Sequence, residues 1–456
     1  MKKEQSFINI SDKTLASRLG YGVNFDVVRK QVQYQNQNIV FYFLSSLVSQ
    51  DAVNDILENI HKKNLICNGS VDFEQDINVV ESQVQAGMLA ILNYPGHKYL
   101  VVDVRSYPDR SSQEPESEKS VKGSHDGFTE HMLTNTALIR RRIKSRNFRV
   151  ELLQIGELSK TYVNVYYIEN RVNKQVYQEV MQKLKNIDID SLTMTDRALA
   201  EILFQQTFNV FPVVRFTERP DIAAIHILKG YLVLMIDTSP GAIIVPTTFF
   251  ELCQQPMEYH FSPIISSFGR LLRYFSIFIA MFLVPLWFLV ASDPSIDSNF
   301  LILNESLSRQ ELFIQILVVE LFLSFIRLAS FNTPGLLSTS MSLAATIILS
   351  EVAASIGLVQ GEVVFYCALS SLAAFGIPSF EVSRAVTLWN FLFVLAIGFF
   401  NKIGFIVMSF ILFLTLVSIQ NYGSAYLYPF LPFSLQDFLK TIFRVSSDSK
   451  YTTKVK

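Results

Sequence analysis

The composition of the chain changes near residue 262 from that of a soluble protein to that of membrane-spanning segments, and this change limits the folds that the chain can adopt. Residues 1–260 mix charged and apolar residues as soluble proteins do. The segment 271–291, LLRYFSIFIAMFLVPLWFLVA, then carries a single charge, Arg273, close to its start. At about 1.5 Å per residue, a helix of this length crosses the hydrocarbon core of a bilayer, which is roughly 30 Å thick. We therefore expect a soluble region joined to membrane-spanning helices.

Further apolar stretches follow this first candidate span. They lie at about 312–331, 336–358, 361–377, 385–400 and 403–420. The candidates at 361–377 and 385–400 are short for full spans, so one of them could be re-entrant or packed obliquely. We expect an all-α polytopic membrane domain of four to six helices over residues 262–435.

Basic residues indicate how the membrane domain is oriented. Arg270 and Arg273 precede the first candidate span, and Arg384 precedes the candidate at 385–400. The tail at 436–456 adds Lys440, Arg444, Lys450, Lys454 and Lys456. The acidic loop 292–311 belongs on the opposite side, although Lys402 fits this arrangement less well. Both termini are expected on the cytoplasmic side, which favours an even number of spans.

Composition narrows the function of the soluble half. The formal net charge of −1 argues against general affinity for nucleic acid. Cys67, Cys253 and Cys367 are far apart and form neither a disulfide framework nor a CxxC metal motif. The first residues, MKKEQSFINI, have no apolar stretch behind their lysines, so no signal peptide is expected. Without a recognisable phosphate loop or catalytic set, we expect no enzymatic activity and no cofactor.

The soluble half contains an internal duplication. Segment 42–60 aligns without gaps on 166–184, and each copy is an apolar strand, a polar turn and an amphipathic helix. Segment 99–108 aligns in the same way on 231–240, and each is an apolar strand that ends at a proline. Chance similarity between two strand–helix units is the alternative explanation.

The duplication predicts two small α/β domains, at 20–147 and 148–255. Residues 1–19 are expected to be an N-terminal tail. The polar segment 106–127, with its two prolines, is expected to form a long surface loop.

The segment 121–149, VKGSHDGFTEHMLTNTALIRRRIKSRNFR, joins the two domains. Its ligand-type residues, His125, Asp126, Glu130 and His131, match neither the HExxH helix face nor a zinc spacing, so no metal is expected. Its cations could neutralise phosphates, but no aromatic platform or nucleic-acid module accompanies them.

A structural helix explains the segment better. Apolar and small residues recur every three or four positions, at Phe128, Met132, Thr136, Ile139 and Ile143. Asp126 is placed to cap the start of the helix, and Glu130 lies in its first turn, while the cations complement the dipole at its end. The guanidinium groups are expected to contact acids of a neighbouring domain or subunit, or lipid headgroups. These arginines are Arg140, Arg141 and Arg142.

The same segment resembles the signature of the A subunits of GerA-type spore germinant receptors. The matching positions are Gly123, Gly127, Phe128, Glu130, Asn135, Leu138, Ile139, Arg140, Arg141, Arg142, Ile143 and Lys144. The resemblance continues through ELLQIGELSKTYVNVYYIENRVN, FGIPSFEVSRA and AYLYPFLPFS, and so covers nearly the whole chain. LSEVAASIGLV and NFDVVRKQV favour a sporulation branch of the family over its nutrient-sensing subunits. We take as candidates for a domain or subunit interface Glu130, Asn135, Arg140, Arg141, Arg142 and Lys144.

The resemblance implies a multi-pass protein of the bacterial endospore inner membrane, with its large N-terminal region in the spore core. Such A subunits form homo-oligomers around a pore that releases monovalent cations during germination, or that amplifies this release. The implied partners are a small membrane protein, or the B and C receptor subunits. The alternatives are a nutrient-sensing germinant receptor A subunit and a non-conducting scaffold.

Ionisable residues inside the spans are the candidates for pore lining, because they are costly in a bilayer. Glu320, Ser324 and Arg327 lie at steps of four and three, on one helix face. Glu351 and Ser355 lie beside a hydroxylated stripe in the next span, which could line a wet pore. An ion pair between Glu320 and Arg327, and a simple packing seam, are the alternatives.

Overall fold

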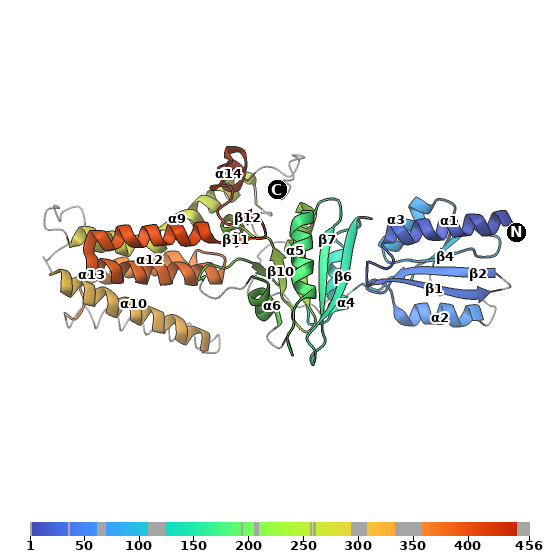
Figure 1. The fold of residues 1–456 in the computed structure, drawn as a ribbon, viewed down its shortest axis with the longest axis horizontal. Helices are drawn as coiled ribbons and strands as arrows, with labels where there is room; N and C mark the ends of the chain where they lie inside the picture. Colours follow the sequence, from blue (N-terminus) through green and yellow to red (C-terminus); the bar gives the residue numbers. More distant parts are fainter. Residues whose placement is uncertain are drawn as a thin grey trace.

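The computed structural model describes most of the chain. The described residues are 2–34, 37–61, 70–107, 124–192, 195–204, 209–255, 258, 261–292, 308–332 and 357–444. Figure 1 shows an elongated molecule with one sheet near the N-terminus, a second sheet in the middle and a helical bundle at the other end. The predicted order of two α/β domains followed by an all-α membrane domain is confirmed.

A five-stranded antiparallel sheet, in the order β1-β2-β4-β5-β3, forms the first domain. Its strands are β1 (Val27–Tyr34), β2 (Gln37–Leu44), β3 (Val71–Glu74), β4 (Leu89–Leu92) and β5 (Tyr99–Val102). Helices α1 (Lys2–Leu19) and α3 (Ile77–Gln85) cover one face of the sheet, and α2 (Gln50–His61) covers the other (Figure 1). β4 and β5 are buried throughout because helices cover both faces.

Residues 1–19 are not a tail, so this expectation is wrong. Helix α1 buries Leu15 and Leu19 in the core against the sheet. Asp12 accepts hydrogen bonds from Arg29 (2.8 Å) and from the hydroxyl of Tyr42 (2.5 Å). The polar start of the sequence therefore leads into a helix that closes one face of the first sheet.

The second sheet repeats the first, in the order β6-β7-β9-β10-β8. Its strands are β6 (Phe148–Ile155), β7 (Thr161–Ile168), β8 (Arg215–Thr217), β9 (Leu232–Ile236) and β10 (Ala242–Val245). Its helices are α5 (Lys174–Lys185), α6 (Thr195–Phe204), α7 (Pro220–Lys229) and α8 (Phe249–Leu252). The internal duplication is therefore confirmed by the shared strand order.

Only one of the two predicted alignments pairs equivalent strands. β7 and α5 begin 124 residues after β2 and α2, as the alignment of 42–60 with 166–184 requires. The alignment of 99–108 with 231–240 is wrong, because it pairs β5 with β9, whereas the sheet order makes β9 the counterpart of β4. The offset grows to 143 residues for β4 and β9, since α6 lies between α5 and β8 in the second copy.

The membrane domain contains long apolar helices. They are α9 (Pro263–Ala291), α10 (Arg309–Asn332), α12 (Gly361–Phe375) and α13 (Phe380–Ser418). Within the described residues, α9, α10 and α13 are long and apolar enough to cross a membrane, and α12 is a shorter apolar helix. The candidate span at 336–358 lies almost wholly outside the described residues.

Helix α13 is a hairpin of two helices. Asn401 has non-helical dihedrals (φ 55°, ψ −136°), and the rings of Phe393 and Phe405 lie 5.4 Å apart on either side of it. A Cβ on Gly404 would lie 2.1 Å from the carbonyl oxygen of Ala396, so the two halves touch through their backbones. At about 1.5 Å per residue, each half alone is close to bilayer length.

The helical membrane domain ends earlier than the predicted residue 435. After Ser418 the chain forms a small hairpin, β11 (Gln420–Asn421) and β12 (Ser424–Ala425), and then α14 (Leu435–Ile442). The predicted boundary is too late because Ile419, Tyr422 and Tyr426, at the start of this stretch, pack against the second domain.

Candidate functional site

The first candidate site is the joint between the two soluble domains. Helix α4 (Met132–Arg140) lies in it, with Ala137 in the core of the first domain and Leu138 in that of the second. The loop before β1 pairs with the edge of the second sheet. Asn24 accepts a hydrogen bond from the amide of Val150 (2.7 Å), and the amide of Phe25 donates to the Val150 carbonyl (3.1 Å).

Arg140 forms a buried two-point ion pair at this joint. Its Nε and Nη2 lie 2.5 and 2.6 Å from the two carboxylate oxygens of Asp26. The side chains are 6% and 0% exposed, and the guanidinium also lies 5.1 Å from the ring of Phe148. Ser46 donates a further hydrogen bond to Asp26 (2.8 Å). The pair therefore joins an acid from the first domain to the end of α4.

The neighbouring arginines have other contacts. Arg142 pairs with Asp126 (2.6 Å), which belongs to the same segment, and the guanidinium of Arg141 lies 5.1 Å from the ring of Tyr107. Burial opposes ionisation of Asp126, but hydrogen bonds from Arg142 and Ser124 hold its pKa below the usual value. Of the three arginines, Arg140 is the one for which the structure shows an ion pair with an acid from outside the segment 121–149, and Arg142 pairs within that segment.

The helix begins later than the sequence predicts. His131, and not Asp126, is its N-cap, because His131 Nδ1 accepts from the amide of Thr134 (3.4 Å). Asn135 fixes the loop before the helix through two hydrogen bonds with the backbone of Thr129 (2.8 and 2.5 Å).

The remaining interface candidates have simpler surroundings. The carbonyl of Glu130 accepts a hydrogen bond from the amide of Thr238 (3.1 Å), while the side chains of Glu130 and Lys144 are exposed.

Among the residues that the structure places, no group of three or more His, Cys, Asp or Glu could hold a metal. Burial, together with the charges of Lys229 and Arg215, lowers the pKa of His226 well below its ordinary value, so this histidine is neutral.

The second candidate site lies in the membrane helices. Glu320 (6% exposed) and Arg327 (9% exposed) are buried on α10. Arg327 donates hydrogen bonds to Ser371 on α12 and to Thr387 on α13 (3.3 Å). Within the described part of the chain, the carboxylate of Glu320 has no hydrogen bond, and Glu320 and Arg327 form no ion pair. The alternative of an intrasubunit pair is therefore not what the structure shows.

The other three pore-lining candidates differ from these two. Ser324 lies on α10 between Glu320 and Arg327 but is exposed, and its hydroxyl donates to the carbonyl of Glu320 (2.8 Å). Glu351 and Ser355 lie outside the described residues.

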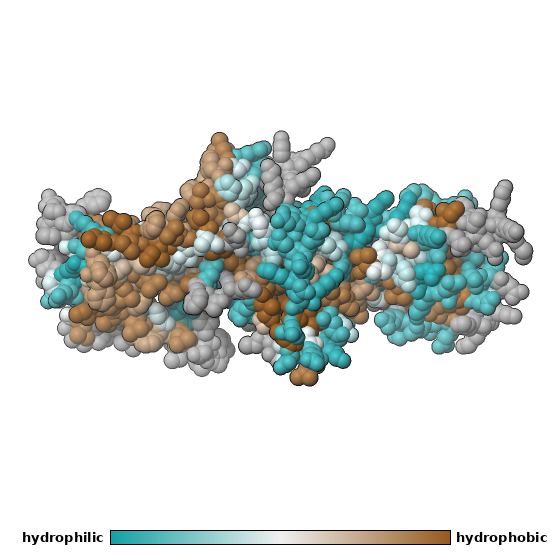
Figure 2. Space-filling model, in the orientation of Figure 1, coloured by the Kyte–Doolittle hydropathy of each residue, from teal (hydrophilic) through white to brown (hydrophobic). Residues whose placement is uncertain are grey.

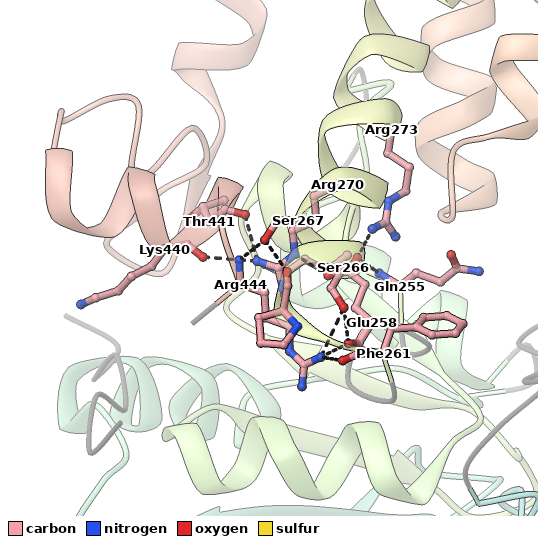
Figure 3. A network of polar contacts seen from close by, with 12 residues as sticks. Gln255, Glu258, Phe261, Ser266, Ser267, Arg270, Arg273, Lys440, Thr441 and Arg444 are labelled. Atoms are coloured by element: carbon pink, nitrogen blue, oxygen red, sulfur yellow. Dashed lines mark hydrogen bonds and ion pairs between the residues drawn. The ribbon is translucent and has the colours of Figure 1, made fainter. Parts of the chain in front are cut away.

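A third cluster, at the base of the first span, was missed by sequence reasoning (Figure 3). The buried carboxylate of Glu258 pairs with both Arg270 and Arg273, which the sequence suggested only as markers of orientation. Arg270 also donates to the carbonyls of Lys440 (3.2 Å) and Thr441 (3.0 Å), near the C-terminus. The sequence contains one signal that could have predicted this cluster, since Glu258 is the only acid between Glu251 and Asp293 and lies close to the two arginines.

The segment after the last span fixes the second domain to the bundle. The buried side-chain amide of Asn421 donates to the carbonyls of Val213 and Thr247 (3.0 Å). Tyr422 donates to the carbonyl of Leu203 (3.0 Å). One hydrophobic cluster runs from β7 and β9 through this segment to α9 and α13, so the second domain and the helices form one packed unit.

The chain is similar to known proteins over nearly its whole length. The model of the family described as Bacillus/Clostridium GerA spore germination protein matches residues 13–454. Stage V sporulation protein AF of Bacillus subtilis is 32% identical over 442 residues, which cover 93% of this chain and 90% of that protein. Spore germination protein KA of the same organism is 27% identical over 449 residues, with 93% and 82% covered.

A solved structure also matches. It is the crystal structure of the N-terminal domain of the A subunit of the Bacillus megaterium spore germinant receptor GerK3. The match covers 52% of this chain and 93% of that one, with 25% identity and a TM-score of 0.39.

Proposed function

The chain belongs to the GerA family of Bacillus/Clostridium spore germination proteins, and from this premise we propose that it is one subunit of an oligomeric ion channel. In this proposal the channel mediates or amplifies the release of monovalent cations during germination. The proposed location is the inner membrane of the endospore, with both soluble domains in the spore core and another membrane germination protein as partner.

The observation that carries the proposal is the buried Glu320. An acid at the centre of a spanning helix costs about 2.5–3.5 kcal/mol, so it is retained where it serves an ion path or a partner. Arg327 has hydroxyl partners on two other helices, whereas the carboxylate of Glu320 has no hydrogen-bond partner among the described residues. A cation is the partner that a carboxylate in this position would accept when the bundle opens or copies assemble.

The charges at the two ends of the bundle support the proposed orientation. Arg270, Arg273 and Arg444 gather at the end that carries the soluble domains. At the opposite end, Arg309 donates to the carbonyls of Ile397 and Gly398, where the first half of α13 ends. The larger group of cations belongs on the cytoplasmic side.

The test is potassium flux from liposomes that contain the full chain, alone and with candidate membrane partners. In the Glu320→Gln variant we expect flux to fall by about tenfold, the change that about 1.4 kcal/mol of lost cation stabilisation produces. The matched control is Glu311→Gln, which alters an exposed acid at the start of the same helix. Glu311 forms a capping box with Ser308, and glutamine can replace glutamate there.

Two results would overturn the proposal. Equal flux in Glu320→Gln and wild type, at equal protein level, removes Glu320 from the ion path. If the wild type conducts no potassium with any of the candidate partners, although its oligomers are intact, a non-conducting scaffold or a nutrient receptor is favoured instead.

A further inference from the structure

The C-terminal helix α14 has an apolar face that the described structure covers only in part, with the rings of Phe430 and Phe433 beside Phe438. Its sequence is LQDFLKTI, in which Leu435, Phe438, Leu439 and Ile442 share one side. No residue of α14 is buried, and Leu435 and Leu439 are 60% and 45% exposed. Figure 2 shows this helix as a largely hydrophobic projection from the side of the molecule. An exposed apolar face of this kind marks an interaction site.

The position of α14 is fixed at the level where the first span begins. Arg270, in the third turn of α9, donates to the backbone carbonyls of Lys440 and Thr441. Beyond the helix, the amide of Arg444 donates to Ser267 (3.0 Å). Figure 3 shows these contacts beside the pair of Arg273 with Glu258, the last charges before α9 becomes wholly apolar. The helix therefore lies beside the part of α9 where the charged residues end and the long apolar run begins.

The start of α9 also exposes apolar side chains. Ile264 and Phe268 are 83% and 62% exposed, and they lie one turn apart on the helix that holds α14. Before α14, Phe433 is 62% exposed, and after it, Phe443 is 49% exposed. The start of α9 and the residues on either side of α14 therefore also expose apolar side chains near the contact between the two helices.

The charges around α14 fit a lipid partner. Lys440 lies within the helix and pairs with Asp437 (3.3 Å), so the cationic surplus comes from Arg444, which follows the helix, and from residues 445–456, which contain three lysines and one acid. Anionic headgroups attract such juxtamembrane cations. A second copy of the chain fits less well, because an eight-residue helix is about 12 Å long. It cannot supply the roughly 800 Å² that each partner contributes to a stable interface.

We propose that α14 is an interfacial helix that lies in the membrane leaflet facing the soluble domains. Its apolar face contacts acyl chains, and the cations around it contact anionic headgroups. This inference goes beyond ion conduction and does not depend on it, because a non-conducting protein would anchor α14 in the same way.

The test places an environment-sensitive fluorophore on the two sides of α14 in the full-length protein. The label is attached at Leu439→Cys on the apolar face, or at Gln436→Cys on the polar side, in a Cys67→Ser background. Cys253 and Cys367 are buried and react poorly. Neither labelled side chain is buried, so the substitutions leave the packed core intact. The proteins are reconstituted in phosphatidylcholine vesicles with or without phosphatidylglycerol, in which a fraction of the lipids carries a quencher near the headgroup.

We expect the label at position 439 to be quenched at least several-fold more than the label at 436, and more strongly when phosphatidylglycerol is present. If the label at 439 were quenched equally in vesicles with and without phosphatidylglycerol, the role of anionic headgroups would be overturned. A label at 439 that is reached by aqueous iodide and not by lipid quencher would overturn the interfacial position. Protection from both quenchers, lost when oligomers dissociate, would overturn the lipid assignment and place a second copy of the chain on this face.

Discussion

Arg140 is the residue on which the joint between the soluble domains most depends. In Arg140→Ala, the fully buried Asp26 loses both hydrogen bonds of its ion pair and keeps Ser46. Removal of one member of a buried pair costs about 3–5 kcal/mol, because the other charge is left in the interior. We expect the soluble domains of the full-length variant in detergent to unfold at a clearly lower urea concentration than those of the wild type. The circular dichroism signal of the strands follows this unfolding.

The adjacent arginine provides the control for this prediction. Arg141 is exposed and contacts the ring of Tyr107, so Arg141→Ala should lower the free energy of unfolding by no more than about 1 kcal/mol. If the two variants unfolded at the same urea concentration, the ion pair would contribute nothing to the joint.

Single residues also mark where sequence reasoning stopped. The arginine cluster and its helix were predictable from charge and periodicity, but Asp26 was not, since it lies 114 residues before Arg140. The cap was assigned to Asp126 on local grounds. Long-range contacts decide otherwise, because Phe128 and Glu130 make backbone hydrogen bonds to Glu218 and Thr238 and hold this stretch extended.

At the scale of elements, the hairpin in α13 depends on a backbone contact between its two halves. A Cβ at Gly404 would meet the carbonyl group of Ala396, which cannot move without distorting the helix. Overpacking of this kind costs about 1–3 kcal/mol. We expect Gly404→Ala to lower the melting temperature of the membrane domain in detergent. The intrinsic fluorescence of Trp287 and Trp389, which lie on α9 and α13, reports this transition.

Gly361→Ala is the matched control for the hairpin. No atom lies within 4 Å of a Cβ at Gly361, which begins α12, so this variant should melt as the wild type does or slightly higher. Identical melting of the two glycine variants would show that the halves of α13 can separate without loss of stability.

The elements that sequence patterns predicted well are those whose pattern depends on local environment. Apolar composition separated the candidates at 385–400 and 403–420, and the structure turns the chain at Asn401, between them. The repeat of a strand and an amphipathic helix located β2 with α2 and β7 with α5. The second alignment failed because β4, β5 and β9 are all short and apolar, so their sequences do not distinguish β5 from β4.

At the scale of the whole molecule, the family, the soluble-plus-membrane architecture and the duplication were all predictable. The connection between soluble and membrane parts was not. It consists of Glu258, which belongs to no motif, and of a hairpin whose apolar composition suggested membrane instead of protein contact. The contacts of the hairpin, and the bond from Arg270 to Lys440 beside Glu258, join segments more than 150 residues apart that meet only in the folded chain.

The connection predicts how movement could pass between the second domain and the helices. In Asn421→Ala, the buried carbonyls of Val213 and Thr247 lose their side-chain donor, at a cost of about 1–3 kcal/mol each. We expect hydrogen exchange at 420–426 to accelerate by about tenfold or more, since 1.4 kcal/mol corresponds to about tenfold, while exchange in β9 and β10 stays unchanged. Ser424→Ala, on the same hairpin but only half-buried, should leave exchange as in the wild type. If Asn421→Ala also exchanged at the wild-type rate, apolar packing alone would hold the two parts together, and the polar contacts would be dispensable for their coupling.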